Sequence, residues 1–229
     1  MEILANGYTL NIPENAFPLS TDSILLSDFA RLPKNARVLD LGAGCGTLGL
    51  LLCAKDHSCS VTGLELTDCA HTAALENIAA NALQSRMESI CGDIRNASAV
   101  LPAGRFDVCV SNPPYFTGGD AGTQHFTARH QFSCTTEQLF QAAAYALRYG
   151  GDFYLVHKPE YLAQLCACAS GVGLEPKELC LVRHQMEAAH NLILLKCRKG
   201  GKTGLKLSEL CLFRSDGTPT EYYKKLYRL

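Results

Sequence analysis

The sequence predicts an α/β fold in which a mostly parallel sheet carries helices on both faces. Short apolar runs alternate with helix-like segments along the chain, which is the pattern of strand–helix–strand units. Two of these runs end in turn sequences, a glycine-rich one at 42–46 and a proline pair at 113–114. The chain has 229 residues, of which 47% are hydrophobic and 19% charged, so we expect one main domain with a sizeable core and exclude disorder.

The expected elements follow one another in order. Strands are expected over residues 37–41, 60–65, 87–92, 106–111, 152–157, 178–183 and 191–197. Helices are expected from the glycine-rich turn to Ala54, over 68–83 with Asp68 as the capping residue, over 135–147, and from Pro159 onward. Residues 116–134 have no clear period and predict a long loop. Residues 8–12 alternate like a small strand, which would suit a hairpin over the ligand site.

Charge divides the chain unevenly. Residues 196–229 hold nine basic and three acidic side chains, whereas the rest holds 12 basic and 19 acidic ones. Such a segment is typical of a surface that meets a polyanion, although a solvated surface would have the same composition. We therefore expect three parts: an appendage at 1–30 covering the ligand site, a main domain at 31–198, and a basic tail at 199–229 packed on that domain.

Several classes of protein are disfavoured. No apolar stretch approaches the roughly 20 residues of a membrane span, and the first residues lack a basic-then-apolar signal pattern, so a cytoplasmic protein is expected. The twelve cysteines form no C-x-x-C pair and are interpreted as reduced, mostly buried thiols. The seven histidines show no ligand spacing either, and no metal site is expected.

A glycine-rich turn lies between the first expected strand of the sheet and the helix that follows it. It runs from Asp40 through Gly42, Gly44 and Gly46, and its glycines would let backbone amides approach a ligand closely. The dinucleotide pattern requires glycine where Thr47 stands, so the turn favours a nucleoside without a pyrophosphate.

Two carboxylates are candidates for the rest of that nucleoside. Glu65 ends the second expected strand, 19 residues after Gly46, where a carboxylate can accept hydrogen bonds from both ribose hydroxyls. Asp93, followed by Ile94, ends the third and could accept from an adenine amine. The alternative interpretation of Asp93 is a turn or helix-cap residue, and that of Glu65 is an edge-exposed carboxylate.

The sequence Asn112-Pro113-Pro114-Tyr115 carries a mechanism. An amine on a base or amide is a poor nucleophile because its lone pair is delocalised. If the side-chain oxygen of Asn112 and the carbonyl of Pro113 accept its two hydrogens, the lone pair becomes available for attack on a sulfonium methyl group. Tyr115 would stack on the planar substrate, a contact worth roughly 1–3 kcal/mol for a base.

Together these motifs resemble the class I S-adenosylmethionine-dependent methyltransferases that modify amines. The stretches 21–30, 128–130, 156–160 and 217–222 are similar to those of the bacterial tRNA adenine N(6)-methyltransferases that act on valine tRNA beside the anticodon. The resemblance implies a Rossmann-like fold with a seven-stranded sheet whose last strand is antiparallel. It also implies S-adenosylmethionine as cofactor and tRNA as partner.

The resemblance assigns roles residue by residue. Asn112, with Pro113 and Tyr115, would be catalytic. The residues implied at the cofactor are Thr21, Asp22, Asp40, Gly42, Gly44, Glu65, Asp93, Ile94 and Asn112. Thr21 and Asp22 would close over its methionine end. Gln131 departs from the family, in which a Glu is expected after Arg129-His130, and this puts a carboxylate role in that loop in doubt.

The RNA contacts and the acceptor are less closely defined by the sequence. Candidate RNA-binding residues are Arg129, His130, Lys158, Lys199 and Lys202, each of which could instead be a surface or packing residue. The Asn-Pro-Pro-Tyr motif would serve a protein glutamine amide equally well, and a guanine amine of ribosomal RNA is a further possibility. A cofactor-binding RNA adaptor without activity is the non-enzyme alternative, which the intact Asn112 disfavours.

Overall fold

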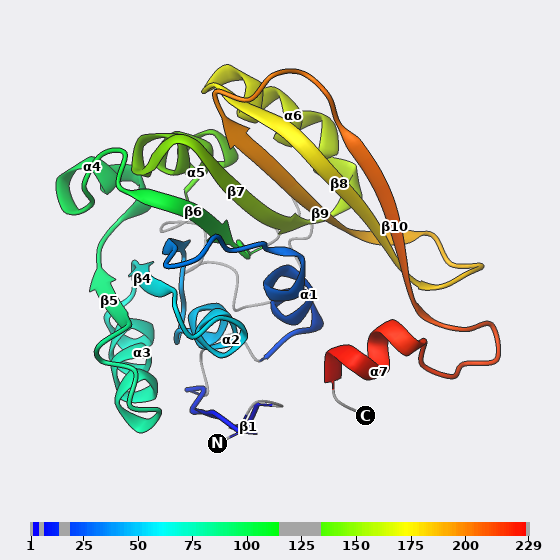
Figure 1. Ribbon diagram of the computed structural model, residues 1–229, viewed down its shortest axis with the longest axis horizontal. Coiled ribbons are helices and arrows are strands. Elements are labelled where there is room, and N and C mark those ends of the chain that lie inside the picture. Colours follow the sequence, from blue (N-terminus) through cyan, green and yellow to red (C-terminus); the bar gives the residue numbers. More distant parts are fainter. Residues whose placement is uncertain (1, 5–6, 14–18, 115–133, 228–229) are drawn as a thin grey trace, which may run out of the picture.

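The structure is a computed structural model that describes residues 2–4, 7–13, 19–114 and 134–227 (Figure 1). The strands are β1 (Glu2–Ile3), β2 (Thr9–Leu10), β3 (Arg37–Leu41), β4 (Ser60–Glu65), β5 (Met87–Cys91), β6 (Phe106–Ser111), β7 (Leu147–His157), β8 (Leu174–Gln185), β9 (His190–Lys199) and β10 (Lys206–Phe213). The helices are α1 (Thr21–Phe29), α2 (Thr47–Lys55), α3 (Asp68–Ala80), α4 (Ala97–Val100), α5 (Thr136–Ala146), α6 (Leu162–Gly171) and α7 (Glu221–Tyr227), with short 3-10 turns η1 (Ile94–Asn96) and η2 (Pro159–Tyr161).

The main sheet has eight strands in the order β10-β8-β9-β7-β6-β3-β4-β5. All neighbours pair in parallel except β9, which runs antiparallel to both β7 and β8. The expected α/β fold is therefore confirmed, and β9 is the antiparallel seventh strand of the expected set. The sheet also has an eighth strand, β10, which was not predicted and lies in the expected basic tail.

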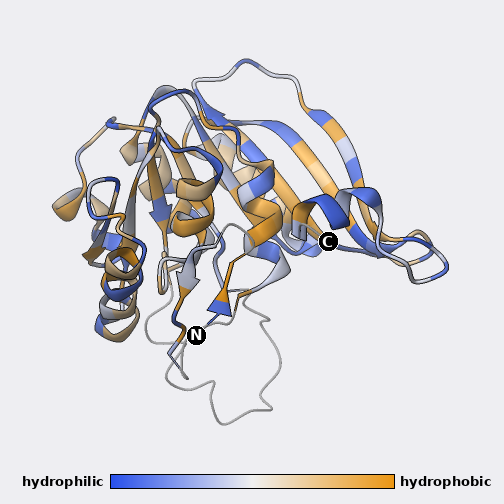
Figure 2. Cartoon of the chain, turned by 60° about the horizontal axis from the view of Figure 1, so that its bottom comes forward, coloured by the Kyte–Doolittle hydropathy of each residue, from blue (hydrophilic) through white to orange (hydrophobic). Residues whose placement is uncertain are grey.

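Two apolar layers lie on opposite faces of the sheet. Neighbouring strand residues alternate between them, so that Val38 faces the layer formed with α1, α2 and α3, whereas Leu39 faces the layer formed with α4, α5 and α6. Figure 1 shows these two groups of helices on either side of the sheet. Figure 2 shows the matching alternation of hydrophobic and hydrophilic residues along the outer strands. This alternation is what period-two side-chain geometry requires of a sheet covered on both faces.

Several element boundaries differ from expectation. Strands β7 and β8 begin at Leu147 and Leu174 and not at 152 and 178, and α3 ends at Ala80 and not at 83. Asp68 is the first residue of α3 and not its cap, because the preceding Thr67 holds the extended N-cap position. The helix expected to reach residue 147 ends at Ala146, since Leu147 already belongs to β7. Among the described residues, no helix has the length and apolar character needed to cross a membrane.

The two ends of the chain pack on the helices beneath the sheet. The hairpin of β1 and β2 lies against α3, where the backbone nitrogen of Thr9 donates to Asn81 Oδ1 at 2.8 Å. At the other end, α7 lies beside α1 (Figure 1). Tyr222 donates its hydroxyl to Asp28 Oδ2 at 2.8 Å, and the hydroxyls of Tyr227 and Thr21 lie 3.0 Å apart. Thus α7 contacts both ends of α1.

Candidate active site at the carboxyl edge of the sheet

The glycine-rich turn and Asn112 lie side by side. They follow β3 and β6, which are neighbours in the sheet with Asp40 paired to Val110. The hydroxyl of Ser111 donates to the carbonyl of Leu41 at 2.7 Å, so the ends of both strands are held together. The strand order reverses between β3 and β6, and open α/β sheets bind their ligands outside the carboxyl ends of strands at such a point.

The turn has the backbone geometry that its glycines predict. Gly42, Gly44 and Gly46 have φ angles of 77°, 56° and 85°, which are left-handed values that side chains disfavour. A Cβ added at Gly42 or Gly44 would meet no atom of the described residues within 4 Å, so the turn is open toward that part of the chain. Behind it, a Cβ on Gly63 would lie 2.8 Å from the Cβ of Ala43. Gly63 therefore allows the turn to pack closely on β4.

Glu65 holds this turn in place. Its Oε2 accepts from the backbone nitrogen of Gly44 at 2.9 Å, and its Oε1 accepts from the nitrogen and the hydroxyl of Thr67 at 2.9 and 2.8 Å. The carboxylate thus links the glycine turn to the start of α3. Its place at the end of β4 agrees with the expected position, whereas its bond to Thr67 was not predicted.

Asp40 is a buried acid beneath the turn. Its side chain is 2% exposed, and its Oδ2 makes no hydrogen bond to any residue that the structure describes. Burial, followed by repulsion from Glu65, raises the pKa of Asp40 to about 7. A buried carboxylate beside an open glycine turn fits a ligand that carries positive charge, because such a ligand would favour its ionised form.

Asp93 has the capping role that the sequence left open as an alternative. It is the N-cap of η1, and its Oδ1 accepts from the backbone nitrogen of Arg95 at 2.8 Å. The Arg95 guanidinium donates to Oδ2 at 2.7 Å, and these bonds hold the pKa of Asp93 below its usual value. Ile94, the first residue of η1, packs against the layer of α4, α5 and α6. Contact of this pair with an adenine stays a prediction.

Asn112 is held by a residue that the sequence did not single out. Its Nδ2 donates to the hydroxyl oxygen of Ser23 at 2.9 Å. Ser23 is buried in the first turn of α1, and its backbone nitrogen donates to the N-cap residue Ser20 at 3.4 Å. Helix α1 also carries Thr21 and Asp22, so both lie on the helix that contacts Asn112. In the sequence, only the position of Ser23 within the motif at 21–30 indicated that it could belong to the site.

Of the two residues expected to act beside Asn112, the structure describes Pro113 but not Tyr115. Pro113 is half-buried directly after β6, where the sequence placed it. Tyr115 lies outside the described residues, as do Arg129, His130 and most of the expected loop at 116–134. No group of acidic, histidine and cysteine side chains that could hold a metal ion occurs in the described ranges.

The expected RNA-binding lysines lie at opposite edges of the sheet. Lys158 is half-buried directly after β7, at the edge that holds Asn112. Ile193 of β9 pairs with His157 at the end of β7. Lys199 lies six residues further along β9, roughly 20 Å from Ile193. Its Nζ donates to the carbonyls of Ala144 and Leu147 at 2.6 and 2.7 Å.

The ammonium group of Lys199 is therefore held at the end of α5, a position that does not favour the expected RNA contact. Lys202 is exposed nearby, and its carbonyl accepts from Lys177 Nζ at 2.7 Å. Because the glycine turn and Asn112 lie at the other edge, neither lysine is close to them along the strands.

Solved structures share this architecture. A predicted O-methyltransferase from Agrobacterium tumefaciens matches with a TM-score of 0.75 over 91% of this chain and 96% of that one, at 20% identity. The geranyl diphosphate C-methyltransferase of Streptomyces coelicolor matches with a TM-score of 0.59 over 77% of this chain and 76% of that one, at 10% identity. At these identities the likeness concerns the fold.

Comparison of sequences, unlike that of structures, bears on the family of the chain. Residues 20–165 match the model of the methyltransferase small domain family. A tRNA1(Val) (adenine(37)-N6)-methyltransferase of Bacteroides fragilis is 35% identical over 169 residues, 73% of this chain and 71% of that protein. Its counterpart in Tolumonas auensis is 34% identical over 207 residues, 88% and 84% of the two chains. The chain therefore belongs to the methyltransferase small domain family, within the group of tRNA1(Val) (adenine(37)-N6)-methyltransferases.

Proposed function

We propose that the protein transfers a methyl group from S-adenosylmethionine to the N6 amine of an adenine in tRNA, adenine 37 beside the anticodon of valine tRNA. The observation that carries this proposal is the placement of Asn112 next to the glycine turn at the switch point of the sheet. The relatives named for this reaction support the choice of acceptor.

The cofactor fits the residues at this edge. S-adenosylmethionine supplies an electrophilic methyl group on a sulfonium, and it carries two positive charges. Asp40 would face that charge from beneath the turn, and the open positions at Gly42 and Gly44 would leave room for it. Glu65 would meet the ribose hydroxyls while it keeps Gly44 in place, and Asp93 with Ile94 would border the adenine. Thr21 and Asp22 would close over the methionine end from α1.

Asn112 and Pro113 would prepare the acceptor amine. Each offers a carbonyl oxygen to one hydrogen of the NH2 group, so the nitrogen lone pair turns toward the methyl carbon. The new N–C bond would form as the C–S bond of the donor breaks with its electron pair on sulfur, and the extra proton would leave to solvent. Because the two prolines fix the backbone after β6, the carbonyl of Pro113 is held ready for this contact. Tyr115 would stack on the adenine.

The RNA would approach along the same edge. Lys158 directly follows β7, the neighbour of β6, and its position suits a phosphate near the target base. Arg129 and His130 stay candidates from the sequence. An anticodon-loop adenine would have to leave its stack to reach Asn112, at a cost of a few kcal/mol. A tRNA substrate would place the protein in the cytoplasm.

We also propose the expected division of the chain into three parts. Residues 31–198 would bind the cofactor, and residues 1–30 would cover the site through α1. Residues 199–229 would pack on the domain through β10 and α7, both of which contact it.

Parallel methylation assays test the function. Labelled S-adenosylmethionine is incubated with the protein and unmodified tRNA, ribosomal RNA or release factor, and the methylated nucleoside is identified by mass spectrometry. We expect N6-methyladenine in tRNA and no label with Asn112→Ala. Label only in protein or in a guanine of ribosomal RNA would favour the alternative acceptors, and full activity of Asn112→Ala would exclude the proposed chemistry.

A further inference from the structure

Asn77 joins three parts of the chain that are far apart in sequence. It lies on α3 with only 1% of its side chain exposed. Its Nδ2 donates to the carbonyls of Asn11 and Cys45, both at 2.9 Å, and its Oδ1 accepts from the backbone nitrogen of Asn11 at 2.7 Å. Both amide hydrogens and the oxygen are thus used, which fixes the orientation of the amide.

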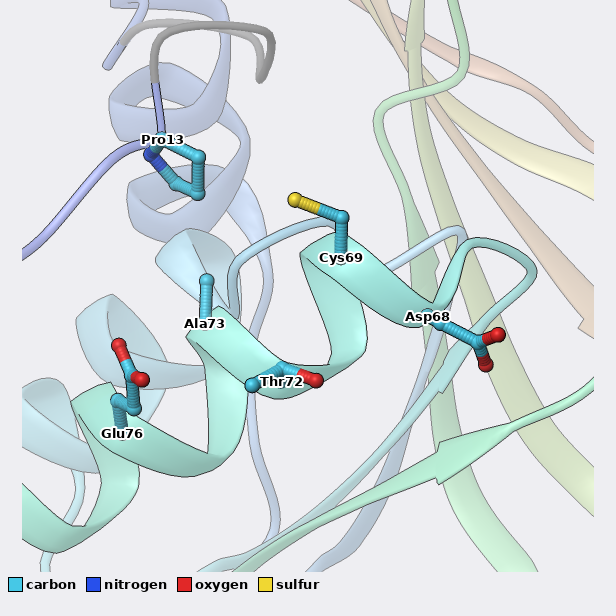
Figure 3. A pocket seen from close by; sticks show the side chains of 6 residues that line it. All are labelled: Pro13, Asp68, Cys69, Thr72, Ala73 and Glu76. Atoms are coloured by element: carbon cyan, nitrogen blue, oxygen red, sulfur yellow. The ribbon is translucent and has the colours of Figure 1, made fainter.

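The contact with Asn11 belongs to a ladder that docks an N-terminal strap, defined here as residues 8–13. One helical turn after Asn77, the side chain of Asn81 accepts from the nitrogen of Thr9 at 2.8 Å and donates to its carbonyl at 2.7 Å. The two asparagines therefore pair with alternate strap residues as a neighbouring strand would. Figure 3 shows the end of the strap, where Pro13 lies beside the face of α3 that carries Cys69 and Ala73.

Only Asn77 also reaches the glycine turn. Cys45 stands between Gly44 and Gly46, two residues with left-handed φ angles and no side chain to restrict them. The carbonyl of Cys45 and the nitrogen of Gly46 belong to one planar peptide unit. Asn77 holds the carbonyl side, and the Gly46 nitrogen donates to the carbonyl of Ala43 at 2.9 Å. The peptide plane is thus held from both sides at the start of α2.

We propose that Asn77 is a positioning residue for the cofactor-binding turn, which it sets by holding the carbonyl of Cys45 while the strap is docked on its other side. The role of the turn in cofactor binding rests on the proposed function. Glu65 holds the same turn through the nitrogen of Gly44, so the two side chains constrain the peptide groups on either side of the Gly44–Cys45 peptide, from different elements. Asn77 is not a catalytic residue, because it would act only through the backbone.

Asn81 is a matched control. It has the same side chain, is the C-cap residue of α3 and holds the same strap, and within the described residues its side chain bonds to Thr9 and to the carbonyl of Asn77 but not to the turn. We expect Asn77→Ala to weaken S-adenosylhomocysteine binding about tenfold in calorimetry, equivalent to about 1.4 kcal/mol, because the carbonyl of Cys45 would lose its buried donor. We expect Asn81→Ala to change it less than about twofold.

Hydrogen exchange gives a second readout that needs no cofactor. The amide of Gly46 should exchange faster in Asn77→Ala than in the wild type, and at the wild-type rate in Asn81→Ala. Equal effects of the two substitutions, or a folded Asn77→Ala with unchanged exchange at Gly46, would overturn the proposal. Should Asn77→Ala not fold, Asn77→Asp keeps the shape and the acceptor for Asn11 but loses the donors, and the same outcomes apply.

The two proposals fail in different ways. If the wild-type chain bound no S-adenosylhomocysteine, the proposed function would fail, whereas the exchange of Gly46 would still decide the role of Asn77. If binding and methylation were intact in the wild type and in Asn77→Ala alike, only the positioning role would be wrong.

Discussion

Asp40 is a single carboxyl group whose protonation links the stability of the fold to its ligand. Burial raises its pKa from 3.8 to about 7. Between these values the folded chain keeps a proton that the unfolded chain has released, so the stabilisation is complete below about pH 4 and is lost as the pH rises to 7. A cationic ligand would reverse this loss by favouring the ionised form.

Substitution of Asp40 by Asn removes this proton dependence. We expect Asp40→Asn to approach the wild type in stability near pH 4 and to exceed it progressively toward pH 7, by up to roughly 1.4 kcal/mol for each pH unit. Above pH 7 the difference should be constant. Thermal unfolding without ligand over pH 4 to 8 measures it. A difference that does not vary with pH would mean that Asp40 titrates normally.

Ser23 positions the side chain of Asn112, whose Nδ2 donates to the Ser23 hydroxyl oxygen at 2.9 Å. A planar amide can turn over without changing shape, but only its oxygen can accept hydrogens from an amine. We expect Ser23→Ala to lower kcat about tenfold with an unchanged KM for S-adenosylmethionine, since a lost oriented acceptor is worth about 1 kcal/mol or more. Ser23→Thr, which keeps the hydroxyl group, should retain much of the wild-type kcat.

Ser27 provides the comparison for this experiment. It is equally buried on the same helix, and its hydroxyl donates to the carbonyl of Ile24 instead of contacting Asn112. Ser27→Ala should leave kcat within about twofold of the wild type. Similar losses from both serine substitutions would indicate that α1 had been disturbed as a whole.

At the scale of elements, lysines complete the ends of two helices. Lys55 Nζ donates to the carbonyls of Ser27, Asp28 and Ala30 at 2.8, 2.6 and 2.7 Å, around the end of α1. Lys199 does the same for α5. The last carbonyls of a helix lack partners within it and carry partial negative charge, so an ammonium group satisfies both needs.

This assigns Lys199 a structural effect that can be separated from RNA binding. We expect Lys199→Met to lower the melting temperature by several degrees, because it leaves the carbonyls of Ala144 and Leu147 at the end of α5 without a charged donor, at roughly 1–3 kcal/mol. Its tRNA affinity should be unchanged. Lys202→Met, whose side chain is exposed a few residues away, should alter the melting temperature little. A large loss of tRNA affinity with an unchanged melting temperature would restore the expected RNA role of Lys199.

The strands of the main sheet differ in how clearly the sequence predicts them. Residues 37–41, 60–65 and 106–111 were predicted with the bounds that the structure has, and the first and last of these are short apolar runs that end in a turn signal. Strand β10 was not, since Lys206, Ser208 and Glu209 are exposed and interrupt any apolar run. Only Leu212 of this edge strand is buried, which leaves too little of a hydrophobic pattern to predict it.

Prediction of the site from the sequence is limited in the same way as prediction of the strands. The glycines, Glu65 and Asn112 could be placed because each follows a predictable strand, and their positions at one edge follow from a parallel sheet. Ser23 and Asn77 could not, because their partners lie 89 and as many as 66 residues away in sequence. Hydrogen bonds between distant polar side chains have no periodicity to reveal them.

Over the whole molecule, the last helix supports the first. Tyr222 and Tyr227 of α7 contact opposite ends of α1, and Tyr223 stacks on Tyr227 with ring centroids 4.5 Å apart. Because α1 carries Ser23 and the residues proposed at the methionine end of the cofactor, support at its two ends also supports the site. The contact connects β10, the outermost strand, to the centre of the sheet.

Removing only the two hydroxyl groups tests this support. We expect Tyr222→Phe combined with Tyr227→Phe to weaken S-adenosylhomocysteine binding about threefold to tenfold, since two hydrogen bonds at roughly 0.5–1.5 kcal/mol each would no longer hold α1. Tyr149→Phe removes a hydroxyl bonded to the carbonyl of Gly200, far from α1 in the fold, and should have no effect on binding. Unchanged affinity in the double variant would show that α1 needs no such support.

The contact between α7 and α1 also orders events during synthesis. A ribosome makes the glycine turn and Asn112 long before residues 221–227 emerge, so the nascent chain already holds the chemical groups while its first helix lacks its final neighbour. We expect methylating capacity to appear only after residues 221–227 have emerged from the ribosome, which would keep shorter nascent chains from capturing tRNA there.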